Sequence, residues 1–151
     1  MTWKMKEFRD ALAADIVNSW TEDLPAVAWN PEGYDAATGA FAIMVENFAQ
    51  TPEKQIQIRD YPVLDGRADD EDVVGIQFSI RGGTDPDEVS DVIDGLFALF
   101  HDLWSVTIGP VKVVKSNRQS GANLGPDGSG RVSRTENYYF TVNRPLANRA
   151  I

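Results

Sequence analysis

Two adjoining hydrophobic patterns occupy the middle of the chain. Residues 74–80 alternate between apolar and polar side chains, which is the period of a strand with one buried face. After Gly82-Gly83, apolar residues recur at helical spacing as far as Trp104 and give the segment a wide apolar face. The pattern therefore predicts a strand, a sharp turn and a long helix over residues 73–104.

The start of this helix is also readable from its residue types. Asp85 suits the N-cap, Pro86 suits the first helical position, and Glu88 stands three residues after the cap, as in a capping box. These residues predict that the helix begins at Asp85 or Pro86.

The rest of the chain adds one helix and several strands. A stripe of apolar residues predicts a helix over 4–20. Alternation and turn residues predict strands at 26–29, 41–48, 54–61, 106–114 and 134–144. We expect one domain over 1–151 with an α+β fold, in which an N-terminal helix and a second long helix pack against a mostly antiparallel sheet.

One segment shows the apolar spacing of neither a strand nor a helix. Residues 116–131 are rich in glycine, serine and asparagine and have almost no apolar anchor. Loops of this length are uncommon in compact domains and are usually functional or disordered. We therefore predict a long flexible loop at 116–131.

Composition narrows the function classes. The formal net charge is −9, which disfavours general nucleic-acid binding because neutralising phosphates requires clustered Lys and Arg. The chain has no cysteine, which excludes disulfides and cysteine-based metal sites. It shows no signal-peptide pattern and no apolar run of membrane-spanning length, and we expect no membrane partner.

An acidic segment at 65–72 raises the question of a metal site. Its acidic residues do not follow the alternating spacing of a calcium loop with a central glycine. A solvated charged loop is the better interpretation.

The sequence shows no set of residues typical of an enzyme active site. His101 is the only histidine, and no acid or nucleophile is placed in the sequence to act with it. The glycine-rich segment 121–130 precedes a strand, so it lacks the helix N-terminus that holds a phosphate in a P-loop or a dinucleotide site. We expect no enzymatic activity and no cofactor.

Protein interaction is the remaining class. Tyrosine and arginine are favoured at protein interfaces and gather around the last strand. The alternative is an ordinary strand with one solvated face. The candidate interface residues are Arg81, Trp104, Arg118, Arg131 and Tyr139. A second candidate group is acidic and comprises Asp69, Asp70, Glu71 and Asp72.

Four phrases of the sequence occur in the order found in a known family. They are Val-Gly-Ile-Gln-Phe-Ser-Ile-Arg-Gly at 74–82, Asp-Glu-Val-Ser-Asp-Val-Ile-Asp-Gly-Leu at 87–96, Leu-Gly-Pro-Asp-Gly-Ser-Gly-Arg at 124–131 and Asn-Tyr-Tyr-Phe-Thr-Val-Asn-Arg at 137–144. In this order the chain resembles the tail terminator and minor capsid proteins of long-tailed bacteriophages. The likeness covers residues 74–144, and the acidic loop at 65–72 has no place in the family pattern.

The resemblance implies a structural virion protein of the phage tail or neck, made in the host cytoplasm. Such proteins form a ring, expected here to be a hexamer, at the head-proximal end of the tail tube. The ring stops polymerisation of the tube protein and joins the tail to the connector proteins of the head. DNA passes through its lumen without specific binding.

The resemblance also gives the candidate residues their roles. Arg118 and Arg131 anchor a loop that contacts a neighbouring subunit or the tube, and Trp104 is buried against the next subunit. The acidic residues at 69–72 pair with a basic partner or line the lumen, where they repel the phosphates of DNA. Two alternatives stay open: another neck protein, such as a stopper or head-completion subunit, and a small ligand-binding or regulatory α+β domain.

Overall fold

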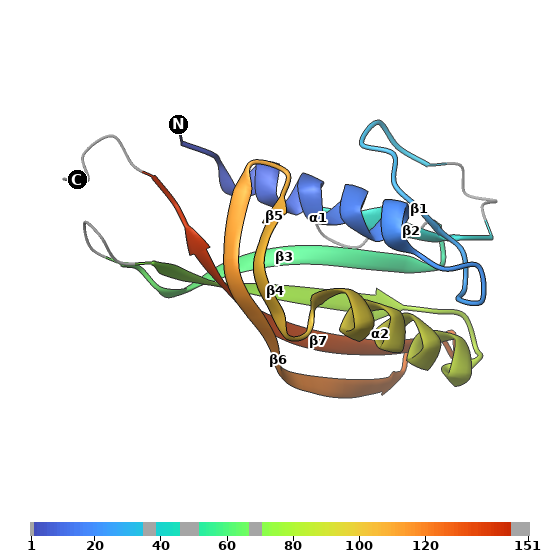
Figure 1. Ribbon diagram of the computed structural model, residues 1–151. Helices are drawn as coiled ribbons and strands as arrows, with labels where there is room; N and C mark the ends of the chain where they lie inside the picture. The colour runs from blue at the N-terminus through green and yellow to red at the C-terminus, as the bar shows by residue number, and fades with distance from the viewer. Residues whose placement is uncertain (1, 35–38, 46–51, 67–70, 146–151) are drawn as a thin grey trace.

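A curled sheet with both helices on its concave side dominates the structure (Figure 1). The computed structural model describes residues 2–34, 39–45, 52–66 and 71–145. Its helices are α1 (Met5–Ser19) and α2 (Pro86–Phe100). The strands in the described residues are β1 (Val27–Ala28), β2 (Phe41–Met44), β3 (Gln55–Leu64), β4 (Asp72–Arg81), β5 (Leu103–Ile108), β6 (Val111–Pro126) and β7 (Val132–Asn143).

The strand order corrects the predicted fold class. The sheet runs β1-β2-β3-β4-β7-β6-β5, and it is mixed because β1 and β3 both pair with β2 in parallel. The remaining pairs, from β3 to β5, are antiparallel. The prediction of a helix-packed α+β fold is wrong, since one curled mixed sheet makes up most of the protein and the two helices fill its concave side. Strands 41–48 and 54–61 were expected to be neighbours, and they are, but in the parallel sense.

The core lies between the helices and the concave side of the sheet. Phe100 of α2 stacks on Phe78 of β4, with ring centroids 5.5 Å apart, and meets Tyr138 and Phe140 of β7 edge-on. Phe8 of α1 meets Phe140 edge-on from the other helix. The alternation predicted for 74–80 is confirmed, because its apolar residues are buried in this core.

Helix α2 begins as predicted and ends earlier than predicted. The Asp85 side chain accepts a hydrogen bond from the Asp87 backbone N–H at 2.9 Å, and Pro86 is the first helical residue. Glu88 completes no capping box; it pairs with Lys54 at 2.8 Å instead. The helix stops at Phe100 because Asp102 takes a positive φ of 59°, which turns the chain into β5. Trp104 therefore lies on a strand and not on the margin of a helix.

The flexible loop predicted at 116–131 is also wrong. Residues up to Pro126 belong to β6 and pair with β7 along its length; only Asp127–Arg131 forms a turn. Local register shifts at 118/120 and 123/125 accommodate the irregular sequence. Gly121 is required by packing, since a Cβ there would lie 1.8 Å from Oε2 of Glu136. Gly121 is therefore a site where a neighbouring side chain comes close to the backbone. From the sequence alone, a glycine of this kind looks the same as one in a flexible loop.

Replacing Gly95 of α2 by alanine should change the free energy of unfolding in the direction opposite to that usual for a helical glycine. Replacing a helical glycine by alanine ordinarily stabilises by about 1 kcal/mol. A Cβ at Gly95 would lie 2.5 Å from Trp20 Cη2 and 2.8 Å from Leu24 Cδ1. Trp20 is held in place because its indole N–H donates to the Pro25 carbonyl at 2.7 Å. Overpacking of this kind costs about 1–3 kcal/mol, so we expect Gly95→Ala to lower the free energy of unfolding.

Urea unfolding followed by tryptophan fluorescence measures this effect. Asp91→Ala is the matched control, because Asp91 lies on the exposed side of the same helix. The control should be neutral or slightly stabilising. A Gly95→Ala protein more stable than the wild type would show that Trp20 does not need this space.

Candidate interaction surface

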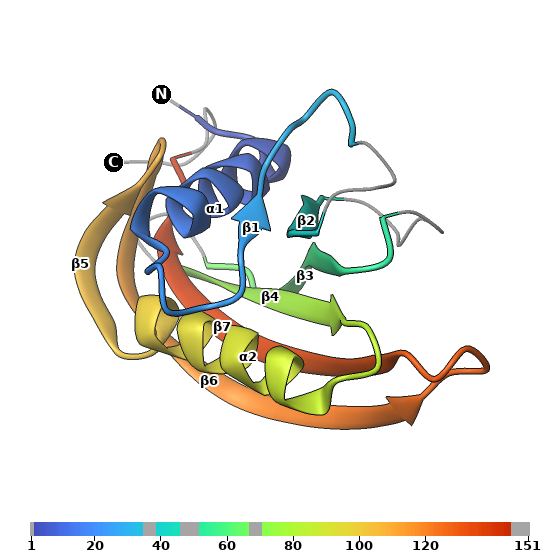
Figure 2. The same cartoon turned by 90° about the vertical axis from the view of Figure 1, so that its right-hand side faces the viewer.

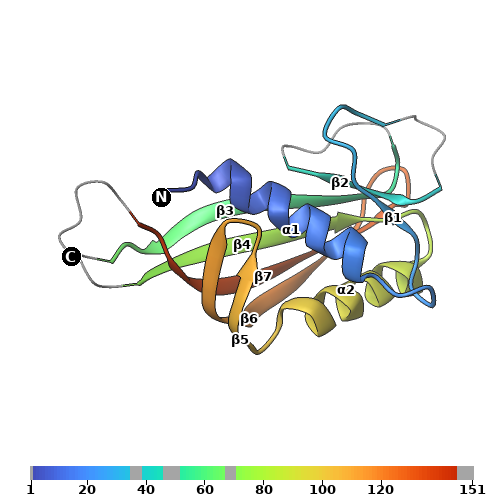
Figure 3. The same ribbon diagram turned by 45° about the horizontal axis from the view of Figure 1, so that its top comes forward.

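The convex side of the sheet faces away from both helices and is here called the outer face (Figures 2 and 3). Pairing registers place alternate residues of each strand on it. Its charged and aromatic members are Arg59, Tyr61, Arg81, Trp104, Lys112, Lys115 and Tyr139. None of the described strand residues on this face is acidic, although the chain as a whole carries a charge of −9.

Trp104 is the most exposed aromatic side chain described on the outer face. It is 61% exposed and sits directly opposite Lys115 on the neighbouring strand. Its indole N–H donates to the Asp102 carboxylate at 2.8 Å, which fixes the ring against the strand edge. Lys112 is exposed on the same face and forms no ion pair among the described residues. A held aromatic ring beside two lysines has the residue types of an interface anchor.

A polar network crosses the centre of the outer face. The amide oxygen of Asn137 accepts hydrogen bonds from Tyr61 Oη at 3.3 Å and Gln77 Nε2 at 3.2 Å. The Asn137 amide nitrogen donates to Ser120 Oγ at 3.1 Å. The Tyr61 ring lies over Gly75, where a Cβ would come within 2.2 Å of it. Partial burial, together with nearby Tyr139, raises the pKa of Tyr61 further above neutral pH.

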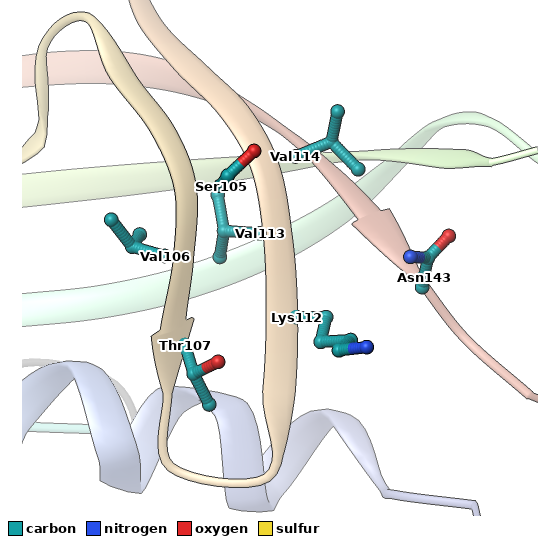
Figure 4. A pocket seen from close by; sticks show the side chains of 7 residues that line it. All are labelled: Ser105, Val106, Thr107, Lys112, Val113, Val114 and Asn143. Carbon is teal, nitrogen blue, oxygen red and sulfur yellow. The ribbon is translucent and has the colours of Figure 1, made fainter.

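A shallow hollow opens at the β5–β6 end of the sheet (Figure 4). Its volume is about 240 Å³, and Thr107, Lys112 and Asn143 share one side of it by strand register. A second hollow of about 210 Å³ lies beside Trp29 and Tyr34. Sites for drug-sized ligands usually have volumes of about 300–1,000 Å³. The hollow at Lys112 is therefore better matched to a single side chain than to a cofactor.

The predicted interface residue Arg118 lies under α2 and away from the outer face. Its guanidinium stacks 4.3 Å from the Phe97 ring centroid and pairs with Glu136 at 3.2 Å. Glu136 is 2% exposed. Oε2 of Glu136 has no partner among the described residues. Arg118 therefore neutralises a buried carboxylate inside this chain.

The single histidine is engaged in the same region. His101 stacks on Phe97, with ring centroids 4.3 Å apart, and its Nδ1 accepts a hydrogen bond from the Arg118 backbone N–H at 3.1 Å. Its ring is part of the contact between the end of α2 and β6. Next to it, burial strongly raises the pKa of Tyr138, whose hydroxyl faces the Arg118–Glu136 pair.

Arg81 is also occupied within the chain. It is buried at the end of β4 and donates to the carbonyls of Pro52 at 3.0 Å and Glu53 at 2.8 Å. These carbonyls lie just before the start of β3. Burial lowers the pKa of Arg81. Its contacts hold Pro52 and Glu53 against the end of β4 and leave little of the side chain for a partner.

Arg131 lies at the turn between β6 and β7. Its Nε donates to Asp127 Oδ2 at 2.7 Å, while the backbone N–H groups of Ser129 and Arg131 donate to Oδ1. The Arg131 backbone hydrogen bond contributes most to lowering the pKa of Asp127 below its usual value. The turn is therefore built around a charged Asp127.

This arrangement predicts a pH dependence confined to the turn. Because the folded-state pKa of Asp127 is lowered, its stabilising effect is complete above its unfolded value of 3.8 and is lost as the pH falls through the lowered value. An NMR titration should show the Arg131 Nε and backbone amide shifting together in that acidic range. The same signals should not titrate in Asp127→Asn. Titration of Arg131 in the variant would assign the effect to another group.

The acidic candidates are only partly described. Asp69 and Asp70 lie outside the described residues. Glu71 is exposed, and Asp72 is buried at the start of β4, where its Oδ1 accepts from the Gly66 backbone N–H at 2.6 Å. Asp72 is thus a structural residue whose side chain is engaged within the chain.

The described residues contain neither a metal-binding cluster nor a membrane-spanning helix. No group of three acidic or histidine side chains there has the arrangement to hold a metal ion. No helix in the described ranges is long and apolar enough to cross a membrane.

The chain was compared with protein families and with individual proteins. No protein-family model and no curated protein matches the chain. Of the five interface candidates, the structure brings Trp104 and Tyr139 onto the exposed outer face and gives Arg81, Arg118 and Arg131 contacts within the chain. Lys112 and Lys115 lie on the same face but were not among the interface residues predicted from the sequence. Lys112 had a local signal, since it stands between the buried Val111 and Val113. Lys115 had none, because it reaches the outer face only through the bulge at 113/115.

Proposed function

We propose that this protein is a structural subunit of a phage virion, a tail terminator that assembles with its own copies at the head-proximal end of the tail tube. The observation that carries the proposal is the fixed, exposed Trp104 on a sheet face free of acidic strand residues. Such a surface suits association with another protein. The order of sequence phrases over 74–144 supplies the particular class.

In this role the subunit stops polymerisation of the tube and joins the tail to the connector proteins of the head. The expected assembly is a hexameric ring with DNA passing through the lumen. The exposed Glu71 fits an acidic lumen that repels phosphates. A ring whose lumen is basic would contradict that part of the proposal.

The contacts of His101 favour a structural role over catalysis. Its Nδ1 and its ring face are both used in packing α2 against β6. A general base needs a free lone pair within reach of a substrate. The small volumes of the described hollows likewise do not favour the alternative of a ligand-binding domain.

Deleting the gene in a phage that carries it tests the proposal against the other neck proteins. A terminator deletion should give overlong tails by negative-stain electron microscopy. DNA-filled heads that leak beside tails of normal length would indicate a stopper instead. Infection that proceeds with normal particles would contradict any virion role. Locating the chain in a cryo-EM map of the particle would then fix the ring size and the face that meets the tube.

A further inference from the structure

The two sides of the molecule carry opposite charge. On the outer face, Lys112 and Lys115 stand on β6 beside Trp104, and the strand residues around them are uncharged or basic. On the opposite side, the exposed surface of α2 carries Asp87, Asp91 and Asp94. These carboxylates form no ion pair among the described residues.

The acidic residues of α2 form a regular stripe. Spacings of four and three residues place Asp87, Asp91 and Asp94 on one side of the helix, and Ala98 continues the same line. The helix rises about 1.5 Å per residue, so Asp87 and Asp94 are about 10 Å apart along it. Ala98 is exposed and follows them by about one turn. We call these four residues the α2 stripe.

The lysines of the outer face lie close together on one strand. Lys112 and Lys115 flank the bulge of β6 at 113/115, and register places both on the outer face. They lie opposite Asn143 and Thr141, which are two residues apart on β7, so the lysines are about 7 Å apart along the strand. Trp104 lies beside Lys115, and the hollow in Figure 4 lies beside Lys112. We call Trp104, Lys112 and Lys115 the lysine patch.

We propose that the lysine patch of one copy binds the α2 stripe of a second copy. The two lysines pair with carboxylates of the stripe, and Trp104 covers Ala98. The occupant is identified by charge complementarity: the stripe and the patch have opposite sign, and every copy carries one of each. The identification rests on the self-assembly in the proposed function, but it does not depend on a phage tail.

The arrangement of the two surfaces determines the kind of assembly. The patch lies on the convex side of the sheet, and α2 lies on the concave side (Figure 2). The contact is therefore heterologous, with each copy using a different surface toward each neighbour. Heterologous contacts build a closed ring where the rotation closes and an open filament where it does not.

Nucleic acid is the competing occupant for a basic face. Binding to phosphates requires several clustered cations, and the affinity falls steeply with salt. The patch offers two lysines in a chain of charge −9. A second copy of the chain, which carries the complementary stripe, is favoured.

Paired charge reversals test the contact. Lys112→Glu with Lys115→Glu makes the patch acidic, and Asp87→Lys with Asp94→Lys makes the stripe basic. Each double variant alone should weaken self-association roughly 100-fold in sedimentation velocity, because like charges then face each other. An equimolar mixture of the two should associate again, since each variant presents the sign that the other needs. Recovery on mixing is diagnostic of a heterologous contact.

Matched controls carry the same change of net charge elsewhere. Glu22→Lys with Asp23→Lys matches the stripe variant, and Lys4→Glu with Lys6→Glu matches the patch variant. Both should associate like the wild type, and circular dichroism should show that all four proteins fold. If a reversed protein fails to fold, Trp104→Ala replaces it, and wild-type association that weakens with added salt supports the same contact.

The other outcomes overturn the proposal in distinguishable ways. If both reversed proteins associate like the wild type, this contact is wrong and the proposed function still stands through another surface. If duplex DNA binds the wild type but not the patch variant while self-association is unchanged, the occupant is nucleic acid. If the wild type stays monomeric at all concentrations and never joins tails, both the contact and the proposed function fail.

Discussion

Phe100→Ala should lower the free energy of unfolding by about 3–5 kcal/mol, the cost of removing a fully buried phenylalanine. Phe100 is 0% exposed and contacts three other aromatic rings, from β4 and β7. Its loss leaves a cavity where α2 meets the centre of the sheet. For a domain of this size the midpoint of thermal unfolding should fall by roughly 10 °C.

Thermal and urea unfolding of the variant measure this cost. Leu124→Ala is the control, because Leu124 is a large apolar side chain on β6 that is exposed. The control should change stability by less than about 0.5 kcal/mol. A Phe100→Ala protein of wild-type stability would place the core elsewhere than under α2.

Arg118→Met should destabilise the protein by about 2–3 kcal/mol, although Arg118 is on the surface side of its pair. The variant leaves Glu136 buried without its cation, and breaking a buried pair from one side costs about 3–5 kcal/mol. The expected loss is smaller because the Arg118 side chain is 37% exposed, so water screens its interaction with Glu136. The Phe97 contact is partly retained by the methionine.

A double-mutant cycle separates the pair from its surroundings. Arg118→Met with Glu136→Met removes both charges and should recover most of the lost stability. Lys115→Met removes another positive charge of the same strand and should be nearly neutral. A double variant less stable than Arg118→Met would mean that Glu136 makes favourable contacts of its own.

The sequence predicted the elements whose signal is local. The alternation at 74–80 and the Asp85-Pro86 start of α2 depend on neighbours within a few residues, and the structure confirms both. The end of α2 was wrong because apolar spacing continued past Phe100, while the turn depends on one backbone angle at Asp102. The parallel pairing of β1, β2 and β3 depends on contacts that no local pattern encodes.

The candidate surface was less predictable than the core. Residues 117–126 were read as a loop because their side chains are small and polar, yet β7 pairs with them throughout, and β5 leaves their other edge open beyond Ser116. Trp104 was singled out by type and assigned to the wrong element. Arg118 was singled out by type as well, but only the structure reveals that it neutralises Glu136.

The order of the strands has a consequence for how the chain is made. The central strand β4 is flanked by β3, which precedes it, and by β7, which is synthesised last, and the Trp3 indole N–H donates to the carbonyl of Asn143 near the end of β7. A nascent chain emerging from the ribosome therefore holds β4 with one edge unpaired until translation reaches β7. Such intermediates are prone to aggregate, so synthesis of this protein should depend on chaperones more than its size alone suggests.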